Sequence, residues 1–257
     1  MIRDFVRNSV LYKRVRKPAV FIKSFQGAPE LVKRTSRFID CVRLYPKWAA
    51  CFGDDISPLG LGLPWITFAA ISYLESNLKS SDVVFEYGSG GSTTFFAKYC
   101  KLIESVDHDP EWETLVQKYL VENGISNVKL RFIPGVPTSE PMDDTSDPDS
   151  YRSLTYGPRY ADLMFENYVK SIDQFPDNYF DVVLVDGRAR PACFRRAERH
   201  VKPGGMIILD NSDRKRYTRI QDEAVSRGWR ALHLSGPTVC NSVLTTTSIF
   251  LKPDPNI

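Results

Sequence analysis

The sequence predicts an α/β fold, a doubly wound and mostly parallel sheet of seven strands that ends in an antiparallel hairpin. From Val83 onward, short apolar runs alternate with segments of helical periodicity, a pattern typical of βαβ units. The first run is followed at once by a glycine-rich turn, and several runs end on an acidic residue. The link between the last two runs is too short for a crossover helix, so these strands should pair antiparallel.

The predicted strands are residues 83–87, 102–107, 128–133, 180–186, 206–209, 229–234 and 245–251. Apolar residues at helical spacing predict helices between them at 92–100, 111–123, 163–175, 191–201 and 214–227. A further helix precedes the first strand and runs to about Leu78. Pro64 suits its first position, because proline has no N–H to leave unpaired there.

Two parts and one insertion are expected along the chain. Residues 1–63 form a basic, mostly helical N-terminal extension, broken at Pro18, Gly27–Pro29 and Pro46, and residues 64–257 form the α/β domain. Within that domain, residues 134–160 are rich in Pro, Ser, Thr and acids. A long loop of this kind is interpreted as a mobile flap beside the ligand pocket, and a surface insertion without function is the alternative.

Length and composition indicate a globular protein. The 257 residues are 42% hydrophobic and 25% charged, and no run reaches the length of a membrane span. Five scattered cysteines, without CxxC spacing, argue against a disulfide framework and against a zinc site. With no apolar signal segment after Met1, a cytoplasmic location is expected.

The charge is concentrated at the N-terminus. Residues 1–50 carry twelve Lys and Arg against three Asp and Glu, a net charge of +9, which leaves −6 for the remaining 207 residues. The simplest interpretation is a solvated helical face, but interleaved apolar residues keep peripheral contact with a membrane open. The negative remainder and the lack of an RNA-recognition motif argue against a nucleic-acid partner. The oligomeric state is left open.

The turn Gly88-Ser89-Gly90-Gly91 is the strongest local signal. Glycines let a backbone turn sharply and approach a ligand, and the helix that follows offers unpaired N–H groups. The dinucleotide fingerprint G-x-G-x-x-G/A fits poorly, because Thr93 occupies its third position. The alternative pattern is acid-x-G-x-G, which Glu86 begins. A tight turn without a ligand also remains possible on these residues alone.

Asp107 ends the second predicted strand, 19 residues after Gly88. An acid about 20 residues beyond such a turn is placed to accept hydrogen bonds from ribose hydroxyls. The competing interpretation makes Asp107 a helix cap or turn residue before Pro110, and His108 and Asp109 are interpreted as turn residues.

Residues 64–252 resemble class I S-adenosylmethionine-dependent methyltransferases, which have a Rossmann-like fold. The resemblance is carried by the acid-x-G-x-G motif, by the acid after the second strand, and by Lys202-Pro203-Gly204-Gly205 before the fifth. It implies S-adenosylmethionine as cofactor, bound by Glu86, Gly88, Ser89, Gly90 and Asp107. Leu63-Pro64-Trp65 resembles the entry of some bacterial members, which implies that Trp65 lies near the cofactor; core packing is the alternative.

Asp186, Asp210 and Asn211 follow the fourth and fifth strands and are the candidate catalytic and metal-binding residues. The arrangement resembles catechol-type O-methyltransferases, in which Mg²⁺ or another divalent cation holds the acceptor hydroxyls and lowers their pKa. The sequence departs from them at Ala189, where a lysine is expected. Metal and no metal are both left open, with Asp186 as a general base in the second case.

Arg188 and Arg190 lie beside the same predicted pocket and are the candidate substrate-binding residues. A guanidinium binds carboxylate or phosphate, which suits an acidic sugar, a sugar phosphate or a carboxylated aromatic. Ion pairs with the protein's own acids are the alternative.

The sequence therefore favours a methyltransferase that acts on an oxygen of a small molecule or a saccharide. Two other classes stay open. One is an NAD(P)-dependent oxidoreductase, and the other is a non-catalytic nucleotide-binding or membrane-peripheral module.

Overall fold

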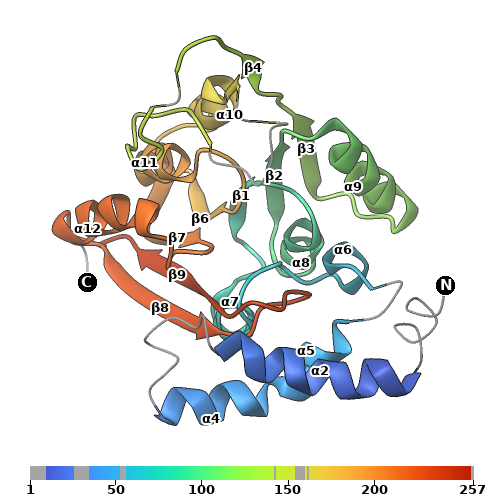
Figure 1. Cartoon of the computed structure of the whole chain (residues 1–257). Helices are drawn as coiled ribbons and strands as arrows, with labels where there is room; N and C mark the ends of the chain where they lie inside the picture. Colours follow the sequence, from blue (N-terminus) through green and yellow to red (C-terminus); the bar gives the residue numbers. More distant parts are fainter. Residues whose placement is uncertain are drawn as a thin grey trace.

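A seven-stranded mixed sheet organises the molecule, with strand order β3-β2-β1-β6-β7-β9-β8 (Figure 1). The computed structural model describes residues 10–25, 35–52, 56–141, 143–153, 160 and 162–255. The strands are β1 (Val83–Tyr87), β2 (Leu102–Asp107), β3 (Val128–Phe132), β6 (Phe180–Val185), β7 (Val201–Leu209), β8 (Arg230–Gly236) and β9 (Thr245–Leu251). The first five pair in parallel, and β9 pairs antiparallel with both β7 and β8, which confirms the predicted fold class and its reversed hairpin.

Strand residues alternate between two hydrophobic cores, one on each face of the sheet. In β6, Val183 and Val185 pack into one core, and Val182 and Leu184 into the other. This is the period of two that an extended chain imposes on its side chains. Helices α10 (Glu166–Lys170), α11 (Arg190–His200) and α12 (Thr218–Ser226) cover the first face, and α7 (Phe68–Asn77) and α8 (Gly91–Tyr99) cover the second. Helix α9 (Pro110–Glu122) packs against β3 and against the short α6 (Pro58–Leu61).

The N-terminal extension belongs to the core of the second face. Its helices α2 (Val10–Ser24), α4 (Thr35–Arg43) and α5 (Tyr45–Ala50) lie together below α7 and the β8–β9 hairpin in Figure 1. Phe21 and Trp48 are buried in the same cluster as residues of α7 and β1. The Trp48 indole N–H also donates 2.7 Å to the carbonyl of Asn241, in the loop between β8 and β9.

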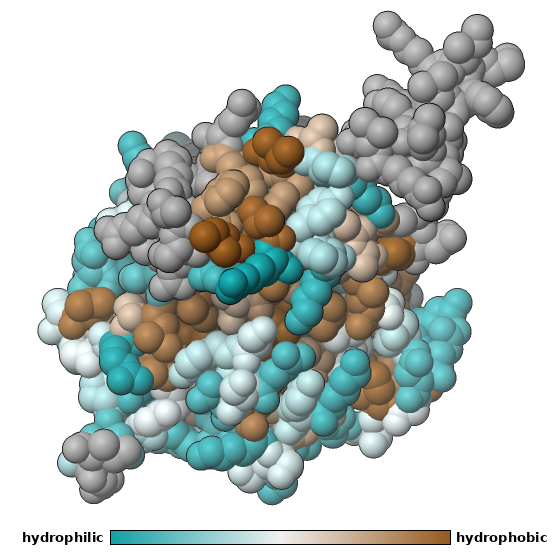
Figure 2. Space-filling view, turned by 90° about the horizontal axis from the view of Figure 1, so that it is seen from below, coloured by the Kyte–Doolittle hydropathy of each residue, from teal (hydrophilic) through white to brown (hydrophobic). Residues whose placement is uncertain are grey.

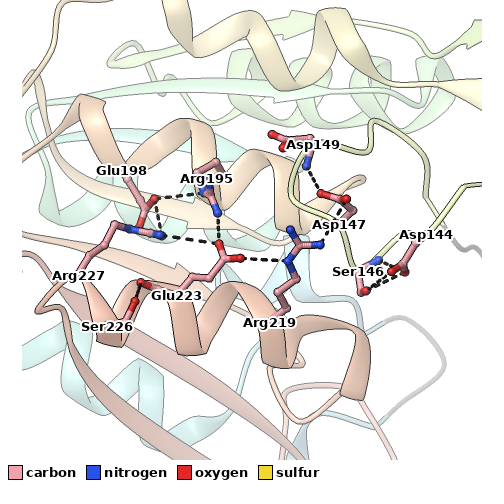
Figure 3. A network of polar contacts seen from close by, with 10 residues as sticks. All are labelled: Asp144, Ser146, Asp147, Asp149, Arg195, Glu198, Arg219, Glu223, Ser226 and Arg227. Carbon is pink, nitrogen blue, oxygen red and sulfur yellow. Dashed lines mark hydrogen bonds and ion pairs between the residues drawn. The ribbon is translucent and has the colours of Figure 1, made fainter.

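The predicted flap is tied down at several points. Its ends pair as the short strands β4 (Val136–Pro137) and β5 (Leu163–Met164). Farther along, Asp147 lies 3.3 Å from the guanidinium of Arg219 on α12. Figure 3 shows Arg219 between Asp147 and Glu223, next to a second group of ion pairs on α11 and α12. This part of the segment is therefore fastened to the α11–α12 side of the sheet.

Four predicted helix boundaries were wrong. Helix α7 begins at Phe68 and leaves out Pro64, because the Thr67 hydroxyl accepts the N–H of Ala70 and caps the helix there. Helix α2 continues through Pro18. Residues 163–175 form β5, α10 and the 3-10 turn Ser171–Gln174 because Leu163 and Met164 pair with β4. Residues 214–227 begin with a 3-10 turn, Lys215–Tyr217, before α12. The predicted break at Gly27–Pro29 lies outside the described residues.

Trp48→Ala should destabilise the whole molecule. The indole is 2% exposed and packs against Phe21, Tyr45 and Phe52. It also donates a hydrogen bond to the carbonyl of Asn241. Removing a buried aromatic side chain costs about 3–5 kcal/mol in the free energy of unfolding. Urea denaturation measures it, with the exposed Val225→Ala as control, which should stay within about 0.5 kcal/mol of the wild type. A Trp48 variant as stable as the control would show that the extension does not share the core.

Candidate functional site

A cleft of about 600 Å³ lies where β1, β2, β6 and β7 end. Ligands of doubly wound sheets bind at this carboxyl edge. The cleft is lined by nearly all the residues that the sequence analysis selected, namely Trp65, Gly88, Ser89, Gly90, Asp107, Asp186, Arg188, Arg190, Asp210 and Asn211. Glu86 is the exception, since it is fully buried behind the glycine turn.

The turn after β1 is fixed to the end of β2 by Asp107. One carboxylate oxygen accepts both the N–H and the hydroxyl of Ser89, each at 2.8 Å. The other oxygen accepts the N–H groups of His108 and Asp109, at 2.7 and 3.0 Å. Burial alone would raise the pKa of Asp107, but these hydrogen bonds outweigh it and hold the pKa below its ordinary value. Asp107 is therefore an ionised acceptor on the wall of the cleft.

Asp107 is not the helix cap. That role belongs to Asp109, whose carboxylate accepts the N–H groups of Glu111 and Trp112 at the start of α9. Trp112 in turn donates its indole N–H to the carbonyl of Ser89 at 2.8 Å. The backbone N–H and the backbone carbonyl of Ser89 are therefore both hydrogen-bonded. The first turn of α9 and the end of β2 thus keep the glycine turn in one shape.

Glycines are required at two points of the turn. Gly88 has φ +99, a conformation that L side chains rarely adopt. At Gly91, a Cβ atom would lie 2.1 Å from the carbonyl oxygen of Leu63 and 2.4 Å from that of Pro58. The start of α8 therefore touches the backbone of the α6 segment, which brings Trp65 and Pro58 to the rim of the cleft.

Glu86 is a buried carboxyl that is only half satisfied. Its Oε2 accepts the hydroxyls of Thr93 and Ser105 at 2.5 and 2.7 Å, whereas Oε1 has no hydrogen-bond partner among the described residues. Burial raises the pKa of Glu86 to about 7. The Thr93 hydroxyl also accepts the N–H of Gly90, so the residue that spoils the dinucleotide fingerprint holds Glu86 and the turn together.

Arg190 joins the ends of β6 and β7. Its guanidinium lies 2.7 Å from an Asp186 oxygen and 3.7 Å from an Asp210 oxygen. It also donates to the carbonyls of Asp186, Gly187 and Asp210, and to Asn211 Oδ1 at 3.4 Å. These contacts use every N–H of the side chain. The sequence-based prediction assigned Arg190 to the substrate, but in the structure this cation is occupied by the protein's own acids and carbonyls.

The two aspartates differ in access to the cleft. The Asp186 side chain is 20% exposed, and burial raises its pKa although Arg190 opposes the shift. Asp210 is buried, accepts the Thr247 hydroxyl at 2.8 Å, and has a pKa raised to about 7 by burial and by Asp186. Asp186 is therefore the carboxylate that can reach a ligand, and Asp210 supports the wall behind it.

The predicted metal set does not fit a divalent cation. A positive guanidinium occupies the space between Asp186 and Asp210 where the ion would have to lie. Among the residues that the structure describes, no group of three His, Cys, Asp or Glu side chains could hold a metal ion.

The Arg188 guanidinium is held by a hydrogen bond from Nε and by stacking over one aromatic ring. Its Nε donates to Nε2 of His108 at 2.8 Å, and its guanidinium carbon lies 4.7 Å from the centre of the Tyr160 ring. Tyr160 donates its hydroxyl to Asp109 at 2.5 Å, which brings the flap to the edge of the cleft. No carboxylate within the described part of the chain pairs with Arg188 in a salt bridge, in contrast to Arg190.

Several lining residues have no clear signal in the sequence. His108 and Asp109 were interpreted as turn residues, and Trp112 lies in the predicted helix 111–123 without a role of its own. The Asp109-Pro110 pair is a helix start signal that could have identified the cap. Arg214 and Asn241 also line the cleft, and neither belongs to a motif.

Solved structures of methyltransferases share this fold. A methyltransferase-like protein from Silicibacter pomeroyi DSS-3 is 21% identical, with 74% of this chain and 88% of that chain covered and a TM-score of 0.51. A methyltransferase from Geobacter sulfurreducens is 12% identical, with 82% and 96% covered and a TM-score of 0.51. At these identities the likeness shows the fold alone. No protein-family model matches the sequence, and neither does any curated protein.

Glu86→Gln should flatten the dependence of stability on pH. The pKa of Glu86 is raised from 4.5 to about 7, so the folded state binds a proton that the unfolded state has lost, and stability falls as pH rises through that window. The fall is on the order of 3 kcal/mol. Gln keeps an oxygen acceptor for Thr93 and Ser105 and has no charge to bury.

Urea unfolding of both proteins between pH 4.5 and pH 8 measures the difference, and the exposed Glu75→Gln serves as the control. Equal pH profiles for the wild type and Glu86→Gln would show that Glu86 is ionised at no cost. Asp210 shifts in the same direction and remains in the variant, so part of the slope should persist.

Proposed function

We propose that this protein is an S-adenosylmethionine-dependent methyltransferase that transfers the methyl group to an oxygen of a small molecule or a saccharide. One observation carries the proposal. A glycine turn, locked to the carboxylate at the end of the next strand, lines one side of a cleft whose other side carries a partly exposed carboxylate. Both lie in a fold that solved methyltransferase structures share.

The cofactor half of the cleft contains Trp65, Gly88, Ser89, Gly90 and Asp107. Asp107 binds the ribose hydroxyls in this proposal, and a ribose hydroxyl would take the place that the Ser89 hydroxyl holds on the same oxygen. Glu86, with one oxygen unpaired behind the turn, becomes the countercharge for the ammonium of the methionine part once it has lost its proton above about pH 7. The exposed Trp65 ring offers an apolar surface at the rim.

The acceptor half is organised by Asp186. Methyl transfer from a sulfonium needs alignment of the acceptor and, for an alcohol, removal of its proton. The Asp186 carboxylate accepts that proton as general base, and its raised pKa makes it a better base than an ordinary aspartate. Arg190 fixes the carboxylate through one oxygen, while Asp210 holds Arg190 from the other side.

Arg188 gives the acceptor site its charge preference. Its guanidinium is oriented by His108 and Tyr160 and has no carboxylate partner among the described residues. A cation of this kind recognises a carboxylate or phosphate group. Acceptors with both a hydroxyl and an anionic group, such as hydroxylated carboxylates or sugar phosphates, suit the site best.

The other two function classes make different predictions. A nicotinamide site needs a small residue where Thr93 stands, and the Thr93 hydroxyl is already bound to Glu86. A non-catalytic nucleotide-binding module would bind the cofactor but release no S-adenosylhomocysteine with any acceptor. Calorimetry with S-adenosylmethionine, S-adenosylhomocysteine and NAD distinguishes a methyltransferase from an oxidoreductase. A turnover assay with hydroxylated carboxylates and sugar phosphates distinguishes it from a non-catalytic module.

Asp107→Ala should weaken S-adenosylmethionine binding about tenfold to a hundredfold, because a charge-assisted hydrogen bond contributes about 1.5–3 kcal/mol. Calorimetry measures the affinity, and thermal unfolding checks that the protein is folded. Ser89→Ala is the matched control, since it removes the hydroxyl that competes for the same oxygen and should leave affinity unchanged or improved. An unchanged affinity for Asp107→Ala excludes the ribose role.

Asp186→Asn should lower turnover by about a hundredfold or more while S-adenosylmethionine affinity stays the same, because the proton acceptor is lost and the residues proposed to hold the cofactor are unchanged. EDTA should leave wild-type turnover intact, because Arg190 occupies the candidate metal position. The assay measures release of S-adenosylhomocysteine with a panel of hydroxylated carboxylates and sugar phosphates. Loss of activity with EDTA and recovery with Mg²⁺ would instead require Arg190 to move aside for a metal.

A further inference from the structure

Five apolar side chains on the N-terminal side of the molecule are exposed and have not been explained by the fold or the cleft. They are between 44% and 70% exposed, although they are large and apolar; they are Ile22, Phe38, Ile39, Val42 and Val243. We refer to them as the α2–α4 surface. Single exposed apolar residues are ordinary, but several that lie together mark an interaction site.

Three contacts of Phe25 show that the segments carrying these residues lie side by side. Phe25, one turn after Ile22 on the same side of the chain, packs its ring 4.8 Å from that of Phe38. Phe25 also packs against Cys41 and Leu244, which precede Val42 and follow Val243. On α4, Phe38, Ile39 and Val42 fall within one third of the helix circumference, and all three side chains are exposed. Figure 2 looks onto this side and shows brown apolar residues interleaved with teal hydrophilic ones.

Cations lie next to the apolar residues. Lys23 follows Ile22, Arg43 follows Val42, and Lys47 is exposed on α5. Asp40 is the one acid of residues 38–52, and it pairs with Arg43 at 3.6 Å. Residues 1–50 as a whole carry a net charge of +9. This combination of an apolar helix face with basic flanks is typical of helices that lie in the interface of a membrane.

We propose that the α2–α4 surface docks on an anionic lipid bilayer, with its apolar side chains at the level of the headgroups. A second copy of this chain is a worse partner, because a symmetric contact would bring the same basic segment of two copies together. No helix of the described residues is long and apolar enough to cross a membrane. The contact is therefore peripheral, and negative lipid headgroups supply the complementary charge. This proposal does not depend on the methyltransferase activity.

Removal of the whole extension cannot test the proposal, because Phe21 and Trp48 belong to the core. Point substitutions on exposed residues can. Ile39→Asp combined with Val42→Asp puts two charges on the α2–α4 surface, and Val121→Asp combined with Val225→Asp puts two charges on exposed positions of α9 and α12. The two double variants change the net charge equally, so a general loss of positive charge affects both.

Flotation with phosphatidylcholine vesicles, with and without phosphatidylserine, measures binding. The wild type should float with the anionic vesicles and less so as salt increases. The Ile39/Val42 variant should bind about tenfold more weakly or worse, and the Val121/Val225 variant should bind as the wild type does. Thermal unfolding and cofactor affinity should be alike in all three proteins.

Three results would overturn the proposal. The first is a wild type that stays with the soluble fraction, and the second is equal flotation of the Ile39/Val42 variant and the wild type. The third is a wild-type dimer, seen by light scattering, that the Ile39/Val42 variant converts to a monomer without any vesicle binding, since a second copy would then cover the surface. A failure of S-adenosylmethionine binding in calorimetry contradicts the proposed function and leaves this one untouched.

Discussion

The guanidinium of Arg190 is the contact on which the β6–β7 side of the cleft depends. It binds groups that end two neighbouring strands, and the register of β6 on β7, with Val185 opposite Leu209, brings these groups within its reach. Two carboxylates this close would repel each other without a cation between them. Because Arg190 is the first residue of α11, the same side chain also sets where that helix begins on the sheet. The shape of the site and the packing of the α11 face are therefore determined together.

The two halves of the cleft are held in different ways. On the β1–β2 side, Asp107 receives four hydrogen bonds from the chain, three of them from backbone N–H groups. On the β6–β7 side, the Arg190 side chain binds both carboxylates and carbonyls, and Ala189 and Asn211 adopt positive φ although neither is glycine. Strained conformations of this kind persist only where their surroundings enforce them. In the proposed methyltransferase, the half held by backbone N–H groups suits a constant cofactor, and the half held by the Arg190 side chain can change with the acceptor.

The sequence predicted what depends on short-range pattern. The β1 and β2 strands, the glycine turn and Asp107 were found because periodicity and spacing act over about 20 residues. Contacts between distant segments were not found. No residue close to Arg190 in the sequence reveals that Asp210 lies beside it in the fold. The sequence alone therefore could not decide between a metal site, a substrate-binding arginine and an ion pair within the protein. Helix starts failed for the opposite reason, since a single hydroxyl at Thr67 outweighs the preference of Pro64 for a first turn.

The hydrogen bond from Trp48 to the 241 loop ends on a backbone carbonyl, and this has a consequence for how the protein can diversify. The indole holds the loop whatever side chain stands at position 241, while that position lines the cleft. Exchange of Asn241 therefore keeps the hydrogen bond from the indole and removes the one that the Asn241 side chain accepts from the N–H of Val243. Position 241 is thus a place where the lining of the cleft can change while the extension stays attached through Trp48 and Phe21.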